Sequence, residues 1–395
     1  MLRGAPFFLG LFLFAGCGAS SSPDGGFDAG TARDGGTDAG TGFDGGTQDA
    51  GVVSTTLVVR YPAGTQAVYV RGSEAPFTWS QGLPMQKVDD STWALSVTTA
   101  TRDFEWKPLL DDTTWSKGPN WKARVGATTS VQPHFFRDSG QWTVRWPSFQ
   151  SAVLGNTRAV YVYLPPTYLE NSAARFPVVY MHDGQNLFDP AAAFGGVTWR
   201  VAEALDEAAG TGRFPEVIVV GPNNAGADRL AEYTPTADPM YGGGRGDLYL
   251  RMLAEELKPR VDQELRTRPG RETTALIGSS LGGLSASYAG VKKPEVFGLI
   301  GAMSPSTWWD NRVLLTFVAQ TGSTRPLRVY VDSGDSGPSN DGVADTRDLA
   351  AAYRAQGYVD GVDFTFVVQA GATHTESAWA ARLPGAFGAL LGPGR

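Results

Sequence analysis

The chain has 395 residues, of which 42% are hydrophobic and 18% are charged, so it is long enough to bury at least one large core. The formal net charge is −7, and six aspartates against one arginine between Ser21 and Gly51 account for −5 of it. No basic stripe is left to neutralise phosphates, which argues against a nucleic-acid partner.

The chain begins with an apolar run, APFFLGLFLFAGC, after Arg3. This run is too short to span a bilayer as a mature helix and is typical of a signal peptide over residues 1–16. The single cysteine, Cys17, follows LFAG, which resembles the lipobox of bacterial lipoproteins, with Phe14 where leucine is more usual. We therefore expect lipidation at Cys17 and an exported protein anchored to a bacterial membrane, at the outer membrane or cell surface. A secreted protein with a cleaved signal, or a buried cysteine, is the alternative.

Residues 17–51 contain a near ten-residue repeat of the form RDGGTDAGTG with almost no aliphatic side chains. Nothing in it offsets the entropy of ordering the chain, so the segment is expected to be a disordered tether. The Asp-Gly spacing also raises calcium binding, but the nonapeptide repeat of calcium-binding β-rolls is missing.

Residues 52–140 consist of short alternating segments, such as TTLVVRYP, QAVYVRGS and TWALSVTT, separated by turn residues. A period near two predicts a small all-β sandwich. The segment resembles the early-set immunoglobulin-like modules of glycan-active enzymes, including starch-binding-type modules and the amino-terminal domain of enterochelin esterases.

Five tryptophans of this segment divide into two groups. Trp79, Trp115 and Trp121 lie in turn-rich stretches, where a face-up indole stacks on a sugar or aromatic ligand, or plugs an end of the sandwich. Trp93 and Trp106 lie on expected strands and are predicted to be core. Carbohydrate is therefore a candidate partner of the amino-terminal module.

From residue 148 to residue 395, short apolar runs such as FPVVYMHD, PEVIVVGP, TALIGSS and LRVYVDSG alternate with helical stretches. Runs buried on both faces and linked by helices predict an α/β domain with a doubly wound, mostly parallel sheet. Ligands bind such sheets at the carboxyl ends of the strands, so the chemistry is expected just after these runs.

Gly278, Ser280 and Gly282 form a G-x-S-x-G pattern, which alone is weak evidence in a chain with 50 glycines. The pattern nevertheless follows an apolar strand and opens a helix, which is the placement that a nucleophile elbow requires. Ser280 is therefore the candidate nucleophile, and the neighbouring Ser279 is expected to point away.

A serine hydroxyl needs a base to accept its proton, and the chain has only three histidines. His134 lies in the β-module and His182 follows the second strand of the α/β domain. His374 alone fits the order Ser, acid, His along an α/β-hydrolase, so it is the predicted base.

The acid is expected after LRVYVDSG, in the stretch DSGDSGPSNDGVADTRD. Asp341 is the first choice because it precedes the next helix and leaves enough loop to reach the histidine. Asp335 is the second choice, Asp332 is still on the strand, and Asp345 is placed to cap the helix that follows.

The segments YLPPTYLENSAARFPVVYMHDGQNLFD, EVIVVGPNN, LIGSSLGGLSASYAG and GATHTESAW occur in this order over residues 148–392. They resemble the esterase family of α/β-hydrolases that includes esterase D, feruloyl esterases, enterochelin esterases and mycolyltransferases. The resemblance implies Ser280 as nucleophile, His374 as base and an oxyanion hole from the backbone amides of Leu281 and Gln185. Some enterochelin-type relatives resemble a Ser-His dyad, which leaves the identity of the acid open.

Arg229, Trp308 and Trp309 are expected either to line the mouth of the site and bind substrate or to pin its loops. No cofactor is implied, and no histidine or acidic cluster has metal-ligand spacing.

The predicted function is a serine carboxylic ester hydrolase that acts on a glycan-linked, aryl or siderophore ester. The alternatives are acyl transfer of the mycolyltransferase type and a non-catalytic glycan-binding lipoprotein.

Overall fold

The structure is a computed structural model and describes residues 53–394. The predicted signal peptide (1–16), the lipidation site Cys17 and the predicted tether (17–51) lie outside the described residues. Within residues 53–394, no helix is both long enough and apolar enough to cross a bilayer.

The amino-terminal part is built from two small sheets that share one hydrophobic core. In β1, every second side chain is buried, and the core includes Leu57 and Val59 from one sheet and Val68 and Val70 from the other. The predicted two-layer β architecture is therefore present, and membership of the immunoglobulin-like modules stays a prediction. The first sheet has the order β4 (Gln86–Lys87), β5 (Thr92–Val97), β1 (Thr55–Arg60), β9 (Thr128–Val131), and the second has the order β3 (Leu83–Pro84), β2 (Val68–Gly72), β6 (Phe104–Leu110), β7 (Thr114–Trp115), with β8 (Trp121–Ala123) also on β6.

The five tryptophans of this module divide into three buried and two partly exposed side chains. Trp93 and Trp106 are buried, as expected, whereas Trp121 is only 8% exposed and packs against Trp106 with ring centroids 6.2 Å apart. Of the two alternatives for Trp121, burial within the sandwich therefore fits and a face-up indole does not, because the residue opens β8 and packs into the core. Trp79 and Trp115 are 39% and 38% exposed.

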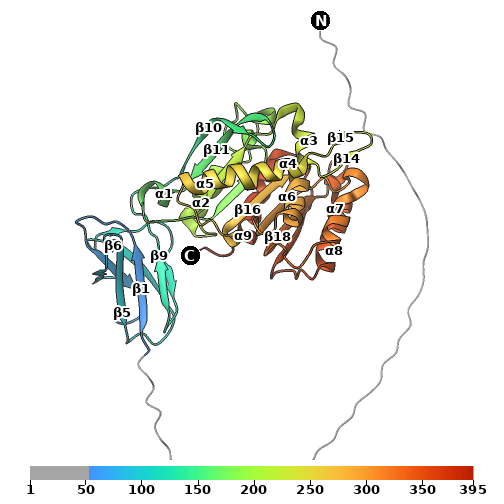
Figure 1. Cartoon of the computed structure of the whole chain (residues 1–395). Coiled ribbons are helices and arrows are strands. Elements are labelled where there is room, and N and C mark those ends of the chain that lie inside the picture. Colours follow the sequence, from blue (N-terminus) through green and yellow to red (C-terminus); the bar gives the residue numbers. More distant parts are fainter. Residues whose placement is uncertain (1–52, 395) are drawn as a thin grey trace, which may run out of the picture. The chain divides into compact units, whose positions relative to one another are not determined.

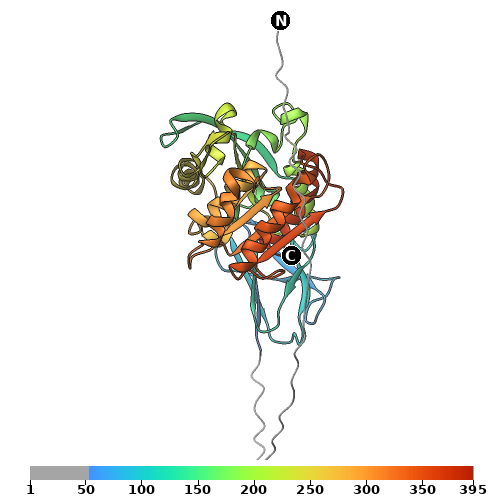
Figure 2. The ribbon, with the colours of Figure 1, turned by 90° about the vertical axis from the view of Figure 1, so that its right-hand side faces the viewer.

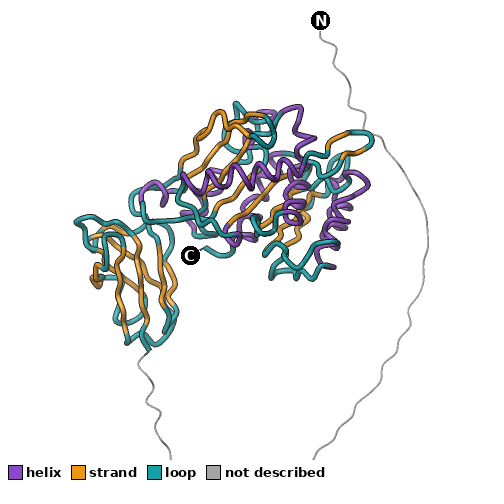
Figure 3. Tube along the Cα trace, viewed as in Figure 1, coloured by secondary structure: helices purple, strands orange, loops and turns teal. Residues whose placement is uncertain are grey.

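The remainder of the chain forms an eight-stranded sheet with helices on both faces, as Figure 3 shows by the orange strands between purple helices. The sheet is parallel from β13 to β19, and only β10 and β11 at one edge run antiparallel to their neighbours. The sheet begins at Gln141, seven residues before the predicted boundary at 148. The strand order is β10 (Gln141–Ser151), β11 (Asn156–Leu164), β13 (Ile218–Pro222), β12 (Val178–Met181), β16 (Thr274–Ser279), β17 (Leu299–Met303), β18 (Arg328–Gly334), β19 (Phe364–Gln369).

Two separate hydrophobic cores fill the two faces of this sheet. The larger core receives residues of α5, α6, α7 and α8, including Leu284 and Leu349, and the smaller receives Leu205 of α2 and Phe387 of α9. Figure 1 shows α4, α5 and α6 in front of the sheet, and in Figure 2 the orange and red helices flank strands of the same colours. The α-helices are α1 (Pro166–Glu170), α2 (Val201–Thr211), α3 (Arg229–Tyr233), α4 (Gly246–Arg251), α5 (Lys258–Glu264), α6 (Leu281–Lys292), α7 (Trp309–Ala319), α8 (Val343–Ala355) and α9 (Glu376–Leu391).

Several short elements complete the chain. A π-helical segment, η4 (Met252–Leu257), joins α4 to α5, and a two-stranded hairpin consists of β14 (Ala237–Asp238) and β15 (Gly242–Gly243). The single-turn 3-10 helices are η1 (Gly184–Asn186), η2 (Phe194–Gly196), η3 (Gly226–Asp228), η5 (Arg271–Thr273) and η6 (Asn340–Gly342).

Candidate active site

Ser280 occupies a sharp turn between β16 and α6. Its φ of 55° and ψ of −123° are strained for a residue with a side chain, which costs on the order of 1–3 kcal/mol. The turn is possible because Gly278 has no side chain: a Cβ there would lie 2.5 Å from Cδ2 of His182. Ser279 is 4% exposed and Ser280 is partly exposed, so the turn presents Ser280, as predicted.

The Ser280 hydroxyl contacts a second serine that the sequence prediction missed. Its Oγ lies 3.4 Å from Oγ of Ser306, whose backbone N–H also donates to the Ser280 carbonyl at 3.0 Å. Ser306 follows β17, the neighbouring strand in the sheet. The rule that ligands lie at the carboxyl ends of the strands identifies this position, since MSPST directly follows an apolar run.

His374 and Asp341 form a hydrogen-bonded pair at the ends of β19 and β18. Nδ1 of His374 lies 2.6 Å from Oδ1 of Asp341. The Asp341 side chain is fully buried, whereas that of His374 is 40% exposed. Burial raises the pKa of Asp341, but hydrogen bonds from His374, Ser304 and the backbone N–H of Gly334 outweigh this effect and hold the pKa below its usual value. Asp341 is therefore an ionised acceptor, and Nδ1 of His374 carries the proton.

The other acid candidates form hydrogen bonds or ion pairs with residues other than His374. Asp335 accepts the Gly371 backbone N–H at 2.7 Å, and Asp332 pairs with Arg382. Asp345 lies in the first turn of α8, with its Oδ1 3.1 Å from Nε of Arg312. Among the residues described, only Asp341 hydrogen-bonds to His374.

The two residues predicted to supply the oxyanion-hole amides, Leu281 and Gln185, lie just after β16 and β12, which are neighbouring strands of the sheet. Leu281 is the first residue of α6, so its N–H has no partner within the helix. Gln185 lies in η1, which packs tightly on β13: a Cβ on Gly184 would lie 2.1 Å from the Gly221 carbonyl oxygen. The side-chain Oε1 of Gln185 accepts the Asn224 N–H at 3.2 Å, so the side chain ties the loop down.

Arg229 is bound to the same loop. Its guanidinium forms two hydrogen bonds with Asp183, Nε to Oδ1 at 2.7 Å and Nη2 to Oδ2 at 2.8 Å, and it lies over the Tyr233 ring. Burial raises the pKa of Asp183. Arg229 and Asn224 lower it by more than burial raises it, so the pKa of Asp183 is below its usual value. The Arg229 side chain remains 27% exposed. These contacts match the loop-pinning alternative.

The two adjacent tryptophans have opposite surroundings. Trp308 is 48% exposed, and its ring meets that of Tyr241 edge-on, with centroids 5.8 Å apart. Trp309 is fully buried, and its Nε1–H donates to the Thr236 carbonyl at 3.0 Å. Of the two alternatives for Trp309, pinning a loop therefore fits and lining the mouth is wrong, because the residue opens α7 and turns into the core. Tyr241, 54% exposed on the turn between β14 and β15, was not predicted.

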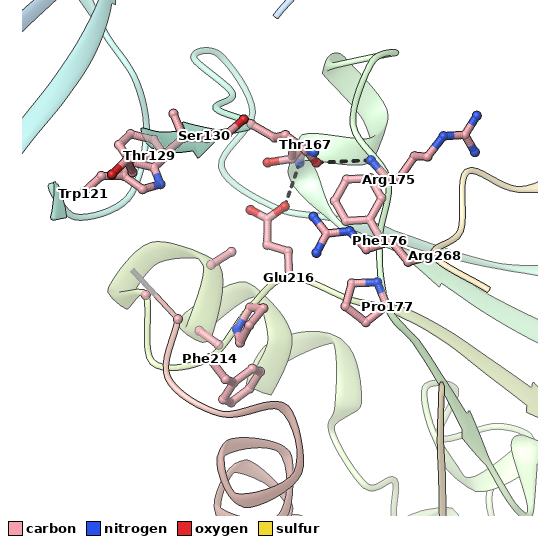
Figure 4. A pocket seen from close by; sticks show the side chains of 17 residues that line it. Trp121, Thr129, Ser130, Thr167, Arg175, Phe176, Pro177, Phe214, Glu216 and Arg268 are labelled. Atoms are coloured by element: carbon pink, nitrogen blue, oxygen red, sulfur yellow. Dashed lines mark hydrogen bonds between the residues drawn. The ribbon is translucent and has the colours of Figure 1, made fainter. Parts of the chain in front are cut away.

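A pocket of about 330 Å³ lies apart from these residues. It is lined by Trp121 and Thr129 on one side and by Thr167, Phe214 and Glu216 on the other, and Figure 4 shows the hydrogen bond from the Thr167 N–H to the Glu216 carboxylate. None of the predicted catalytic residues lines it. Within residues 53–394, no group of three or more histidine, cysteine, aspartate or glutamate side chains is arranged to hold a metal ion.

The mixed eight-stranded sheet, with a strained serine after β16 and an Asp-His pair after β18 and β19, defines the fold as that of an α/β-hydrolase. The model of the family described as "Putative esterase" matches residues 151–390, and the chain belongs to this family. A solved structure titled ferulic acid esterase superposes with a TM-score of 0.51 at 21% identity, covering 64% of this chain and 98% of that one. At this identity the likeness shows the fold alone.

Two curated relatives match shorter stretches of sequence. The chain is 34% identical over 165 residues to the uncharacterized protein YbbA of Bacillus subtilis (strain 168), covering 40% of this chain and 60% of YbbA. It is 31% identical over 159 residues to the iron(III) salmochelin esterase of Escherichia coli O6:H1, covering 40% of this chain and 34% of that protein. The matches therefore span less than two thirds of either relative.

Proposed function

We propose that this protein is a serine carboxylic ester hydrolase in which Ser280 is the nucleophile, His374 the base and Asp341 the acid that orients the base. The observation that carries the proposal is the 2.6 Å hydrogen bond between His374 and Asp341 at the strand edge where Ser280 sits on its strained turn. The chemistry is typical of a Ser-His-Asp triad, in which the carboxylate holds the imidazole in the tautomer that can accept a proton.

The first half of the reaction forms an acyl-enzyme. Oγ of Ser280 attacks the ester carbonyl carbon while its proton moves to Nε2 of His374, and a C–O bond forms. The amides of Leu281 and Gln185 stabilise the resulting oxyanion, each contributing about 3–4 kcal/mol. The ester C–O bond then breaks, and the alcohol leaves with the proton from His374.

The second half releases the acid. Water gives one proton to His374 and attacks the acyl carbon, and the bond to Ser280 breaks as its oxygen regains that proton. The described residues contain no hydrogen bond between His374 and Ser280. The hydroxyl must therefore leave Ser306 and approach Nε2 when substrate binds, which agrees with the looser catalytic contacts of free enzymes.

The substrate is proposed to be an aryl or siderophore ester, or a feruloyl or acetyl ester of a glycan. Tyr241 and Trp308 support an aromatic substrate, because about half of each side chain is exposed, their rings meet edge-on, and Trp308 follows Ser306 closely in the chain. Relatives whose names state an activity include siderophore esterases and an endo-1,4-beta-xylanase/feruloyl esterase, which favours hydrolysis over acyl transfer or a non-catalytic role.

Hydrolysis of p-nitrophenyl acetate, a feruloyl ester and a catecholate trilactone tests this proposal. Ser280→Ala should abolish turnover of each ester that the protein cleaves. Ser279→Ala is the matched control, since that neighbouring side chain is buried, and it should keep activity within about twofold. Full activity of Ser280→Ala, or inactivity of the native protein on all three esters, would refute the proposal.

A second candidate role concerns carbohydrate at the amino-terminal sheets. Trp79 and Trp115 are both more than a third exposed, with ring centroids 6.2 Å apart, and Arg71 lies 5.1 Å above the Trp115 ring. Paired exposed indoles are suited to stacking on sugar rings. The double variant Trp79→Ala/Trp115→Ala should no longer be retained on an insoluble polysaccharide. Val88→Ala, which changes one exposed side chain elsewhere in the same module, should be retained like the native protein. Equal retention of both variants would exclude the role.

Membrane attachment through a lipid on Cys17 is also proposed, on the sequence alone. Cys17→Ala should release the protein from the membrane fraction. An unchanged membrane-bound fraction would rule out the anchor.

A further inference from the structure

Ser304, a buried serine after β17, joins the proposed acid to helix α9. The residue is 1% exposed, and its Oγ has three side-chain partners. Arg382 Nη2 lies at 2.8 Å, Trp379 Nε1 at 3.0 Å and Asp341 Oδ2 at 2.6 Å. A single hydroxyl therefore connects two α9 side chains to the carboxylate that holds His374.

The direction of these hydrogen bonds is fixed by chemistry. Guanidinium and indole N–H groups can only donate, so the Ser304 oxygen accepts from both Arg382 and Trp379. The one proton of Ser304 is then directed to Oδ2 of Asp341. The backbone N–H of Gly334 donates to the same oxygen, which leaves Oδ1 to accept from His374.

Arg382 is itself held firmly. Its Nε lies 3.0 Å from Oδ2 of Asp332, and the two side chains are 3% and 0% exposed. The Tyr330 hydroxyl also donates to that carboxylate, at 2.8 Å. Nη2 of Arg382 also lies 3.7 Å from Oδ2 of Asp341, an ion pair beyond hydrogen-bond distance, so the hydrogen-bonded route from Arg382 to the acid runs through Ser304. A buried, planar guanidinium with a fixed partner is a rigid support for that hydroxyl.

Trp379 supports the same pair from a second side. Its ring meets the His374 ring edge-on, with centroids 4.9 Å apart, while its Nε1–H donates to Ser304. The T-shaped contact limits rotation of the imidazole, and the hydrogen bond limits rotation of the Ser304 hydroxyl.

We propose that Arg382 and Trp379 are positioning residues that act through Ser304 to hold Asp341 with Oδ1 toward His374. The inference rests on the proposed function, because it concerns the orientation of the proposed acid and base. It explains why the carboxylate of Asp341, in the single-turn helix η6 at a backbone φ of 50°, is held in one orientation.

A double-mutant cycle tests whether Ser304 acts through Asp341. In the native background, Ser304→Ala should lower kcat about tenfold with KM unchanged, because the acid loses its orientation and no substrate contact is lost. In the Asp341→Asn background, which should itself lower kcat on the order of 10³-fold or more, Ser304→Ala should add less than about twofold. Equal falls in both backgrounds would overturn the inference, since a general structural defect acts regardless of the acid.

Two further variants distinguish a defect in folding from a loss of the orientation of Asp341. Trp379→Phe keeps an aromatic ring beside His374 but removes the donor to Ser304, and it should lower kcat severalfold without changing KM. Ser116→Ala, at a buried serine just after β7 in the amino-terminal part of the structure, is the matched control and should leave kcat unchanged. Rates are expressed per active site titrated with a fluorophosphonate, so that unfolded protein is not counted.

The outcomes also distinguish this inference from the proposed function. If Asp341→Asn slows the enzyme but Ser304→Ala and Trp379→Phe do not, the inference is wrong and the triad stands. If Asp341→Asn leaves kcat unchanged, Asp341 is not the acid, and both proposals fail at that residue.

Discussion

His182 should make the stability of this protein fall steeply in mild acid. The side chain is 1% exposed beneath the Ser280 turn, with Nδ1 3.1 Å from the Tyr249 hydroxyl. Among the described residues, its Nε2 has no hydrogen-bond partner. Burial lowers the pKa of His182 from 6.5 to about 4, and Asp183 only partly opposes this effect.

The sign and size follow from proton linkage. Below pH 6.5 the unfolded chain protonates this imidazole while the folded chain keeps it neutral, so acid favours unfolding. The contribution of neutral His182 to the free energy of unfolding is complete above 6.5, the pKa of this side chain in the unfolded chain. It is lost as the pH falls toward about 4, the pKa in the folded chain. A difference of about 2.5 between the two pKa values corresponds to about 3 kcal/mol in full and about 2 kcal/mol at pH 5.

Urea unfolding monitored by tryptophan fluorescence at pH 8, 7, 6 and 5 measures this loss. His182→Asn cannot titrate in this range, so its free energy of unfolding should fall by about 2 kcal/mol less than that of the native protein between pH 8 and pH 5. Taking the difference between the two proteins cancels the contributions of other groups. Parallel pH profiles for the two proteins would refute the reasoning.

Three other expectations follow from the geometry. Glu232→Ala should lower the free energy of unfolding by about 3–5 kcal/mol, because it leaves the buried Arg158 guanidinium without its carboxylate; a loss below 1 kcal/mol in urea would contradict this. Gly278→Ala should lower both the melting temperature and the esterase activity, because its Cβ would collide with His182; a melting temperature and an activity equal to those of the native protein would contradict this prediction. Asp341→Asn should lower kcat on the order of 10³-fold while Asp335→Asn stays within about twofold, and the reverse order would reassign the acid.

Much of the site could be predicted because its signals are local. The Ser280 turn requires a strand, a small residue on either side and a helix, all within one short stretch. The choice of His374 needed only the chain order of three histidines. Loop length favours Asp341 over Asp335 without deciding between them, and the structure pairs Asp341 with His374 at 2.6 Å.

Residues whose roles depend on distant partners could not be predicted in the same way. Trp308 and Trp309 are adjacent, and only the docking of α7 decides that one is exposed and the other buried. Arg382 has the sequence surroundings of an ordinary helix-surface cation, yet it is buried against Asp332, 50 positions earlier in the chain. Trp121 faces the core because its strand, β8, pairs with β6. The turn residues that surround Trp121 along the chain give no sign of this pairing.

Trapping of the acyl-enzyme is the most direct test of the central claim that Ser280 carries the acyl group. The protein is mixed with excess p-nitrophenyl acetate, quenched in acid within milliseconds and digested for peptide mass spectrometry. The proposal predicts a single added acetyl group on the peptide that contains Ser280, absent in Ser280→Ala and retained in Ser279→Ala. Acetylation at another residue, or turnover without any acetyl adduct at Ser280, would contradict it.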